Sequence, residues 1–196
     1  KRLGESTLTG GVNCKDVGIS YYKFEYPVEH LKGRIDFTRD TVTLNNLSGS
    51  HGGVNLFFNG WTRGFAPDWK YDIRVTSDNM ALDDDLYNAL SEGQKEFWSA
   101  FSPSGSSAID YRFIRSSPET RTKHLTVELR GVEAVYLSFP YPLKNLTGKL
   151  SFDANNVTIS NVVSRVEERQ IAVDGKVTGR GGNQPGYDVL IKVNNV

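Results

Sequence analysis

An internal repeat limits what this chain can fold into more than any other feature of its sequence. At a fixed offset of 115 residues, positions 12–60 align without a gap with positions 127–175, and 13 of these 49 pairs are identical. Tyr26-Pro27, for example, recurs as Tyr141-Pro142. We therefore expect a first unit at residues 1–126 and a second unit of the same continuous sheet at 127–196. The second unit ends partway through the repeat, which suggests a fragment of a longer array.

Apolar residues recur at every second position inside each copy. Val54, Leu56 and Phe58 alternate with polar or outward positions, and the same period of two occurs at 71–75 and 125–129. This alternation is typical of strands with one buried face, and it favours an antiparallel sheet. Turn residues separate the strands at 39–40, 48–53, 155–156 and 179–186. The pattern predicts a mainly β chain, a meander of about a dozen strands that curves into a trough, a sandwich or a barrel.

One segment, at about 83–101, departs from the period of two. Leu86 and Leu90 are spaced for one face of a helix, as are Phe97 and Phe101. Residues 83–85 are three aspartates that can cap the first turn, residues 91–94 have capping-box spacing, and Gly93 is expected to divide the segment into two short helices. We expect this helical insert to cover one end of the sheet, with a partner-docking helix as the alternative.

Charge and cysteine content exclude several classes of protein and site. Lys plus Arg and Asp plus Glu number 23 each, so the net charge near zero argues against a nucleic-acid binder and gives no reason to expect attraction to anionic membrane surfaces. The single cysteine, Cys14, excludes an internal disulfide and a CxxC metal site, and its alignment with Leu129 indicates a small core residue. No stretch is long and apolar enough for a membrane helix.

Motifs for catalysis or metal binding are not evident. His30 aligns with Asn145 and His51 with Val166 in the other copy, so the repeat does not require imidazole there, and no histidine belongs to a ligand pair. No GxSxG element occurs, residues 180–182 are an isolated Arg-Gly-Gly, and three Asn-x-Ser/Thr sequons at 46, 145 and 156 fit ordinary strand or turn residues. The chain is therefore predicted to be no enzyme, with no cofactor and no metal.

The element Phe139-Pro140-Tyr141-Pro142-Leu143, followed by Leu146-x-Gly148, resembles the signature of AsmA-like proteins, and its first copy begins at Tyr22. A run of Val, Leu, Asn and Gly at 42–60 and a helix step at 79–86 follow in the order typical of that family. Glu25 stands where the family pattern has Pro, and residues 164–168 replace the Gly-rich stretch of the first copy. The resemblance covers nearly the whole chain.

The resemblance implies an open β-groove that binds or conducts phospholipid along an apolar inner face and maintains outer-membrane lipid composition. Such proteins are anchored in the inner membrane of double-membraned bacteria, and this segment would lie in the periplasm. Its expected partners are phospholipid acyl chains and neighbouring repeats of the parent chain, with membrane contact only through other parts of that chain and no nucleic acid. The residues expected to line the groove are Ile35, Phe37, Val42, Leu44, Val54, Leu56, Phe58, Tyr71, Ile73, Val75, Leu125, Val127, Leu129, Leu150, Phe152, Val157, Ile159, Ile171, Val173, Tyr187, Val189 and Ile191.

Two other functions fit the same alternation. A structural or interaction module would close the two copies against each other as a sandwich with a dry core and no ligand. A carbohydrate-acting enzyme would need paired carboxylates in a cleft. Asp72 and Asp188 repeat in both copies but occupy the outward phase of their strands, which favours a solubilising role.

Overall fold

The computed structural model describes residues 8–179 and 184–195, so Arg180 to Gly182 lie outside the described residues, as does part of the turn expected at 179–186. The chain forms one antiparallel sheet of eleven strands in strict sequence order. The prediction of a mainly β meander with a short helical insert is confirmed. The elements are β1 (Thr9–Tyr21), β2 (Phe24–Thr38), β3 (Thr41–His51), β4 (Val54–Arg63), β5 (Lys70–Leu82), α1 (Asp84–Ala89), α2 (Glu92–Phe101), β6 (Gly105–Arg115), β7 (Arg121–Tyr136), β8 (Phe139–Phe152), β9 (Val157–Val166), β10 (Arg169–Thr178) and β11 (Gly186–Asn195).

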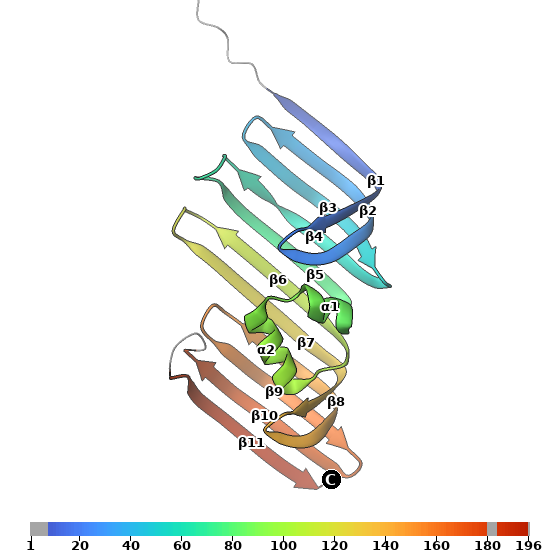
Figure 1. Ribbon diagram of the computed structural model, residues 1–196, viewed down its shortest axis with the longest axis vertical. Coiled ribbons are helices and arrows are strands. Elements are labelled where there is room, and N and C mark those ends of the chain that lie inside the picture. Colours follow the sequence, from blue (N-terminus) through green and yellow to red (C-terminus); the bar gives the residue numbers. More distant parts are fainter. Residues whose placement is uncertain (1–7, 180–183, 196) are drawn as a thin grey trace, which may run out of the picture.

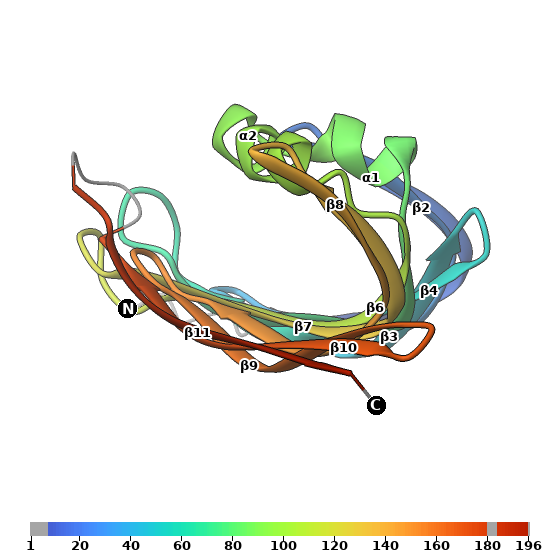
Figure 2. The ribbon, with the colours of Figure 1, turned by 90° about the horizontal axis from the view of Figure 1, so that it is seen from below.

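The sheet is open and curved rather than closed into a barrel (Figure 1). Seen along its long axis, it forms a bent wall in which β2 and β8 curl over at one side (Figure 2). The helices α1 and α2 lie over the inner side of this wall, which we call the concave face. The two copies of the repeat lie side by side in one sheet, so their apolar faces do not cover each other.

The bend arises from backbone irregularities that both copies share. His30 and its counterpart Asn145 have φ values of 53° and 50°, and Asn46 and Asn161 have 48° and 50°. These residues accompany register shifts between β2 and β3, β7 and β8, and β8 and β9. A β-bulge bends its strand and increases the local twist, so a row of bulges at one level folds the sheet over.

Two clusters of buried apolar residues stabilise the concave side. The larger one combines Leu31, Leu47 and Leu56 of the sheet with Leu86 and Ala89 of α1. The smaller one lies on β7, β8 and β9 and contains Leu129, Val132, Leu146 and Val162. Cys14 is buried in the larger cluster, at the position where the second copy places Leu129. The larger cluster therefore fixes helix α1 to the sheet.

The helical insert begins and divides at capping residues. The Asp83 carboxylate accepts a hydrogen bond from the Leu86 amide at 3.0 Å, as expected for an N-cap. The break between the helices lies at Leu90 and Ser91, where Ser91 donates its amide to Gln94 Oε1 at 3.1 Å. The prediction that Gly93 divides the segment is wrong, because Gly93 lies in the first turn of α2. The new helix begins where a capping box satisfies its free amides.

Candidate functional site

The 22 residues expected to line a groove all belong to one face of the sheet. Residues directly opposite in an antiparallel pair share a face, as do alternate residues along a strand. The register joins the predicted residues through such pairs across ten strands, from β2 to β11: Ile35 with Leu44, Leu44 with Gly60, Gly60 with Ile73, Phe58 with Val75, Val75 with Tyr111, Tyr111 with Leu125, Val127 with Leu150, Leu150 with Ile159, Ile159 with Gly175, and Val173 with Ile191.

This shared face is the concave face. Leu86 and Ala89 of α1 pack in the same cluster as Val54 and Leu56 of β4. Phe97 of α2 reaches the sheet, where its ring centroid lies 5.7 Å from that of Phe152. The helices therefore cover the central part of the face that carries the predicted residues (Figure 2).

Much of the concave face remains accessible to solvent. Of the predicted residues, only Val54, Leu56, Leu129 and Val157 are buried. Four are exposed: Val42 by 37%, Val189 by 38%, Ile191 by 61% and Tyr187 by 72%. The remaining predicted residues are half-buried: Ile35, Phe37, Leu44, Phe58, Tyr71, Ile73, Val75, Leu125, Val127, Leu150, Phe152, Ile159, Ile171 and Val173. The face is thus an apolar surface and not a fully packed core.

Sequence reasoning missed the contribution of β6. Ile109, Tyr111 and Phe113 of this strand lie opposite Val127, Leu125 and Lys123, and therefore also belong to the concave face. The repeat gave no signal here because the aligned stretches, 12–60 and 127–175, do not include β6. The period of two from Ile109 to Phe113 was a usable signal on its own.

A row of four aromatic rings crosses the concave face at β5 and β6. The centroid distances are 5.3 Å from Trp69 to Tyr71, 5.8 Å from Tyr71 to Phe113, and 5.4 Å from Phe113 to Tyr111. These separations are those of favourable edge or tilted ring pairs. Burial, and secondarily the neighbouring Tyr71, raise the pKa of the Tyr111 phenol. The row is thus an apolar surface in which the Tyr111 phenol stays neutral.

The opposite, convex face carries paired charges. Arg74 donates two hydrogen bonds to Asp110, of 2.8 and 2.6 Å, and Arg112 donates two to Asp72. The hydrogen bond from each arginine is the main reason why the pKa values of Asp72 and Asp110 lie below their usual range. Both carboxylates are therefore held as ion-pair partners, which makes them poor candidates for general acid or base catalysis.

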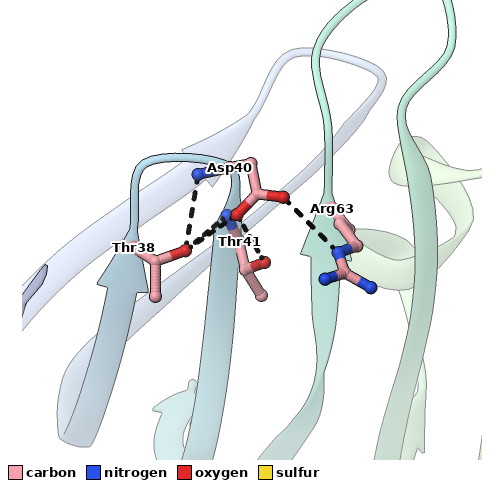
Figure 3. A network of polar contacts seen from close by, with 4 residues as sticks. All are labelled: Thr38, Asp40, Thr41 and Arg63. Atoms are coloured by element: carbon pink, nitrogen blue, oxygen red, sulfur yellow. Dashed lines mark hydrogen bonds and ion pairs between the residues drawn. The ribbon is translucent and has the colours of Figure 1, made fainter. Parts of the chain in front are cut away.

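A polar network at the rim fixes the turn between β2 and β3 (Figure 3). The Asp40 carboxylate accepts hydrogen bonds from the hydroxyls of Thr38 at 3.0 Å and Thr41 at 3.2 Å. Its second oxygen lies 3.5 Å from Nε of Arg63, at the end of β4. The Thr38 hydrogen bond is the largest cause of the lowered pKa of Asp40. This network joins the ends of β2, β3 and β4, and within it the Asp40 carboxylate is paired with the Arg63 guanidinium.

The histidines have local partners. Nδ1 of His30 lies 2.6 Å from Asp16, and Nδ1 of His124 lies 2.7 Å from Asp153. His51 is close to the Pro27 carbonyl, at 2.8 Å. Within residues 8–179 and 184–195, no group of three or more His, Cys, Asp or Glu side chains could hold a metal ion. No helix in this part of the chain is both long and apolar enough to cross a membrane.

Comparison of the chain with models of protein families, with curated proteins and with solved structures gave no match. The candidate site is therefore defined by geometry alone. It consists of the partly exposed apolar residues of the concave face, with the aromatic row of β5 and β6 among them.

Proposed function

We propose that the concave face binds phospholipid acyl chains, and that the chain is a segment of a protein that conducts or holds phospholipid. A single observation carries this proposal: one face of a ten-strand ladder is apolar from Ile35 to Ile191, yet most of its residues remain partly exposed. Exposed apolar areas of this extent usually mark binding surfaces.

The energetics favour a chain-like apolar ligand. Removing apolar surface from water stabilises a complex by about 0.8 kcal/mol for each buried methylene group. Six buried methylenes would thus supply roughly 5 kcal/mol before the costs of association are subtracted. A flexible acyl chain can follow a curved wall across several strands without requiring any one polar partner. This agrees with a site in which hydrogen-bonding groups are few.

The convex face does not offer an equivalent surface. Phe57 is 43% exposed, but its cross-strand neighbours are Ser48 and Thr76. Trp61 lies between Thr43 and Asp72 in the same way. Phe57 and Trp61 are therefore isolated among polar neighbours, whereas the large apolar residues of the concave face are continuous.

The resemblance to AsmA-like proteins suggests the setting of this binding. In a periplasmic segment of an envelope-spanning protein, a continuous apolar wall would shield acyl chains from water between the two membranes, and neighbouring repeats would extend the wall. The second candidate function is an interaction module, in which another protein covers the concave face. The partial cover that α1 and α2 already give to this face favours that candidate.

Lipid extraction is the direct test. Protein purified without detergent is extracted with organic solvent, and the extract is analysed by mass spectrometry. We expect phospholipid in amounts comparable with the protein. A lipid-free extract, together with no uptake of added phospholipid, would contradict the proposal and favour the interaction module.

Charge placed on each face provides a matched comparison. Phe58→Asp puts a carboxylate on the concave face, and Phe57→Asp puts the same group on the convex face of the same strand. We expect Phe58→Asp to reduce bound phospholipid about tenfold or more, because an ionised group opposes acyl contact. Phe57→Asp should leave it near the wild-type level. Equal losses in two folded variants would refute the assignment of the faces; Ile73→Asp offers a second concave position if Phe58→Asp does not fold.

A further inference from the structure

Three cationic residues gather at one end of the concave face. Arg115 is the last residue of β6, and it lies opposite Arg121, the first residue of β7. Lys123 follows on β7, opposite Phe113. The register places all three on the face of Leu125 and Tyr111. Among the described residues, none of the three forms an ion pair with a carboxylate.

Arg115 is a buried cation next to the two exposed ones, Arg121 and Lys123. It is only 6% exposed, and Nη2 donates to the Pro67 carbonyl at 2.7 Å while Nε lies 3.3 Å from the Ser117 carbonyl. These bonds hold the loop before β5 and the turn before β7 around the guanidinium. Because carbonyl dipoles do not cancel a full charge, Arg115 adds a buried positive charge next to Arg121 and Lys123. Glu119, in the same turn, accepts the Ser117 hydroxyl.

Along the concave face of β7, polarity changes once. Arg121 and Lys123 come first, and Leu125, Val127 and Leu129 follow at successive alternate positions. On the neighbouring strands, Tyr71 lies opposite Arg115 and Phe113 opposite Lys123, so the aromatic row starts beside the cations. Its last ring, Tyr111, lies opposite the first aliphatic residue, Leu125. This sequence of cation, ring and aliphatic side chain matches an amphiphile with an anionic head and an apolar tail.

The repeat indicates that this arrangement is not a requirement of the fold. At the offset of 115 residues, Lys123 corresponds to Leu8 and Leu125 to Gly10. Residues that bend the strands recur in both copies, but Arg121 and Lys123 have no cationic counterpart. At positions where the fold does not require a particular residue, the side chain can instead be one that binds a specific ligand.

We propose that Arg121 and Lys123, supported by Arg115, bind the phosphate of an anionic phospholipid whose acyl chains lie on the concave face. The site deepens the proposed function and rests on it. A single-stranded nucleic acid would also meet cations and rings, but aliphatic Leu125, Val127 and Leu150 continue the surface, where bases would gain little stacking. A net charge of zero also gives no long-range attraction for a polyanion.

Short-chain phospholipids that dissolve as monomers test the headgroup preference. Binding of dihexanoyl phosphatidylglycerol and dihexanoyl phosphatidylcholine is measured by calorimetry on the whole chain. We expect phosphatidylglycerol to bind about tenfold more tightly, because it carries a net negative charge, whereas the choline ammonium of phosphatidylcholine offsets its phosphate. Arg121→Gln/Lys123→Gln should reduce this ratio to about one, mainly by weakening the binding of phosphatidylglycerol.

The matched control removes two lysines from the convex face. Lys32 and Lys70 are each next in sequence to a residue of the concave face, Gly33 and Tyr71, so their own side chains point to the convex face. Lys32→Gln/Lys70→Gln therefore gives the same net charge as the test variant without changing the proposed site. Its lipid ratio should equal that of the wild type.

Each other outcome has one meaning. Equal binding of the two lipids by the wild type, or an equal loss of preference in the control, would overturn the headgroup site and leave the acyl-binding proposal intact. Binding of neither lipid would overturn both proposals. Displacement of the lipid by an oligothymidylate at lower concentration would identify the site as one for nucleic acid.

Discussion

The curvature of the sheet should depend on Gly60, which lies in β4 at the level of the bend. Its φ is 146°, a value that L side chains rarely adopt. A Cβ there would lie 2.3 Å from the Asp72 carbonyl oxygen and 2.7 Å from Cα of Ile73. Both contacts are to the backbone of β5, so no rotamer change can relieve them. Gly60→Ala must therefore either separate β4 from β5 or force φ to change.

The cost can be estimated from these two terms. A non-glycine residue in a sparsely populated backbone region costs about 1–3 kcal/mol. Displacing backbone to relieve the close contacts would add a cost comparable with overpacking, about 1–3 kcal/mol. We therefore expect Gly60→Ala to lower the free energy of unfolding by about 2–6 kcal/mol. Domains of ordinary stability have about 5–15 kcal/mol in total, so the variant would be marginal.

Urea unfolding followed by far-ultraviolet circular dichroism measures this loss. Gly18→Ala is the control, because a Cβ at Gly18 meets nothing within 4 Å and its backbone is unstrained. Gly175 repeats the Gly60 geometry, with a 2.3 Å contact to the Asp188 carbonyl, but it faces β11, an edge strand of this sheet. Gly175→Ala should thus cost less than Gly60→Ala. A loss below about 1 kcal/mol for Gly60→Ala, or one equal to that of Gly18→Ala, would refute the reasoning.

Two titratable groups give further predictions. Burial is the main cause that raises the pKa of Tyr26 to about 12, and the carboxylates of Asp83 and Asp85 add to it. The stability that comes from the neutral phenol is therefore complete below pH ~10 and is lost as the pH rises from there through about 12. In an ultraviolet titration, Tyr26→Phe should remove one tyrosine that ionises at high pH. The free energy of unfolding should stay the same or rise by about 1 kcal/mol, since the buried Tyr26 hydroxyl has no hydrogen-bond partner among the described residues. Asp72→Ala should cost under about 1 kcal/mol at pH 7. Because Arg112 lowers the pKa of Asp72, that difference, measured by urea unfolding, should persist above ~4 and vanish as pH falls through the lowered value.

The period of two was sufficient to assign faces. Phe57 and Phe58 are adjacent and chemically identical, yet position in the alternation placed Phe58 with Leu56 and Val54, and the register agrees. The strand alternates strictly because one face packs against the concave core while the other meets water. Nothing beyond local sequence was needed for that assignment, which is why it extended over strands from both copies.

The bend and the helix division could not be read in the same way. His30 and Asn145 are unlike in chemistry but alike in left-handed φ, so comparison of residue types hid a shared conformational role. Asn46 and Asn161 fit a sequence motif, but their structural role lies in the backbone: each donates its amide N–H to a side-chain oxygen of the next strand, Asn59 Oδ1 or Asp174 Oδ1, which fixes the bulge. Such bonds join residues 13 apart in sequence, beyond any local pattern.

Repetition and function separate along this chain for a physical reason. Stacking strands at one curvature requires the same backbone exceptions in every copy, so Gly60 and Gly175 must recur whatever the ligand. A ligand with one head and a long tail needs its polar contact only once, while its apolar contact can extend over every strand. Positions shared by the copies therefore report on shape, and positions that differ on the concave face, such as Lys123, are where the chemistry of a specific ligand would be found.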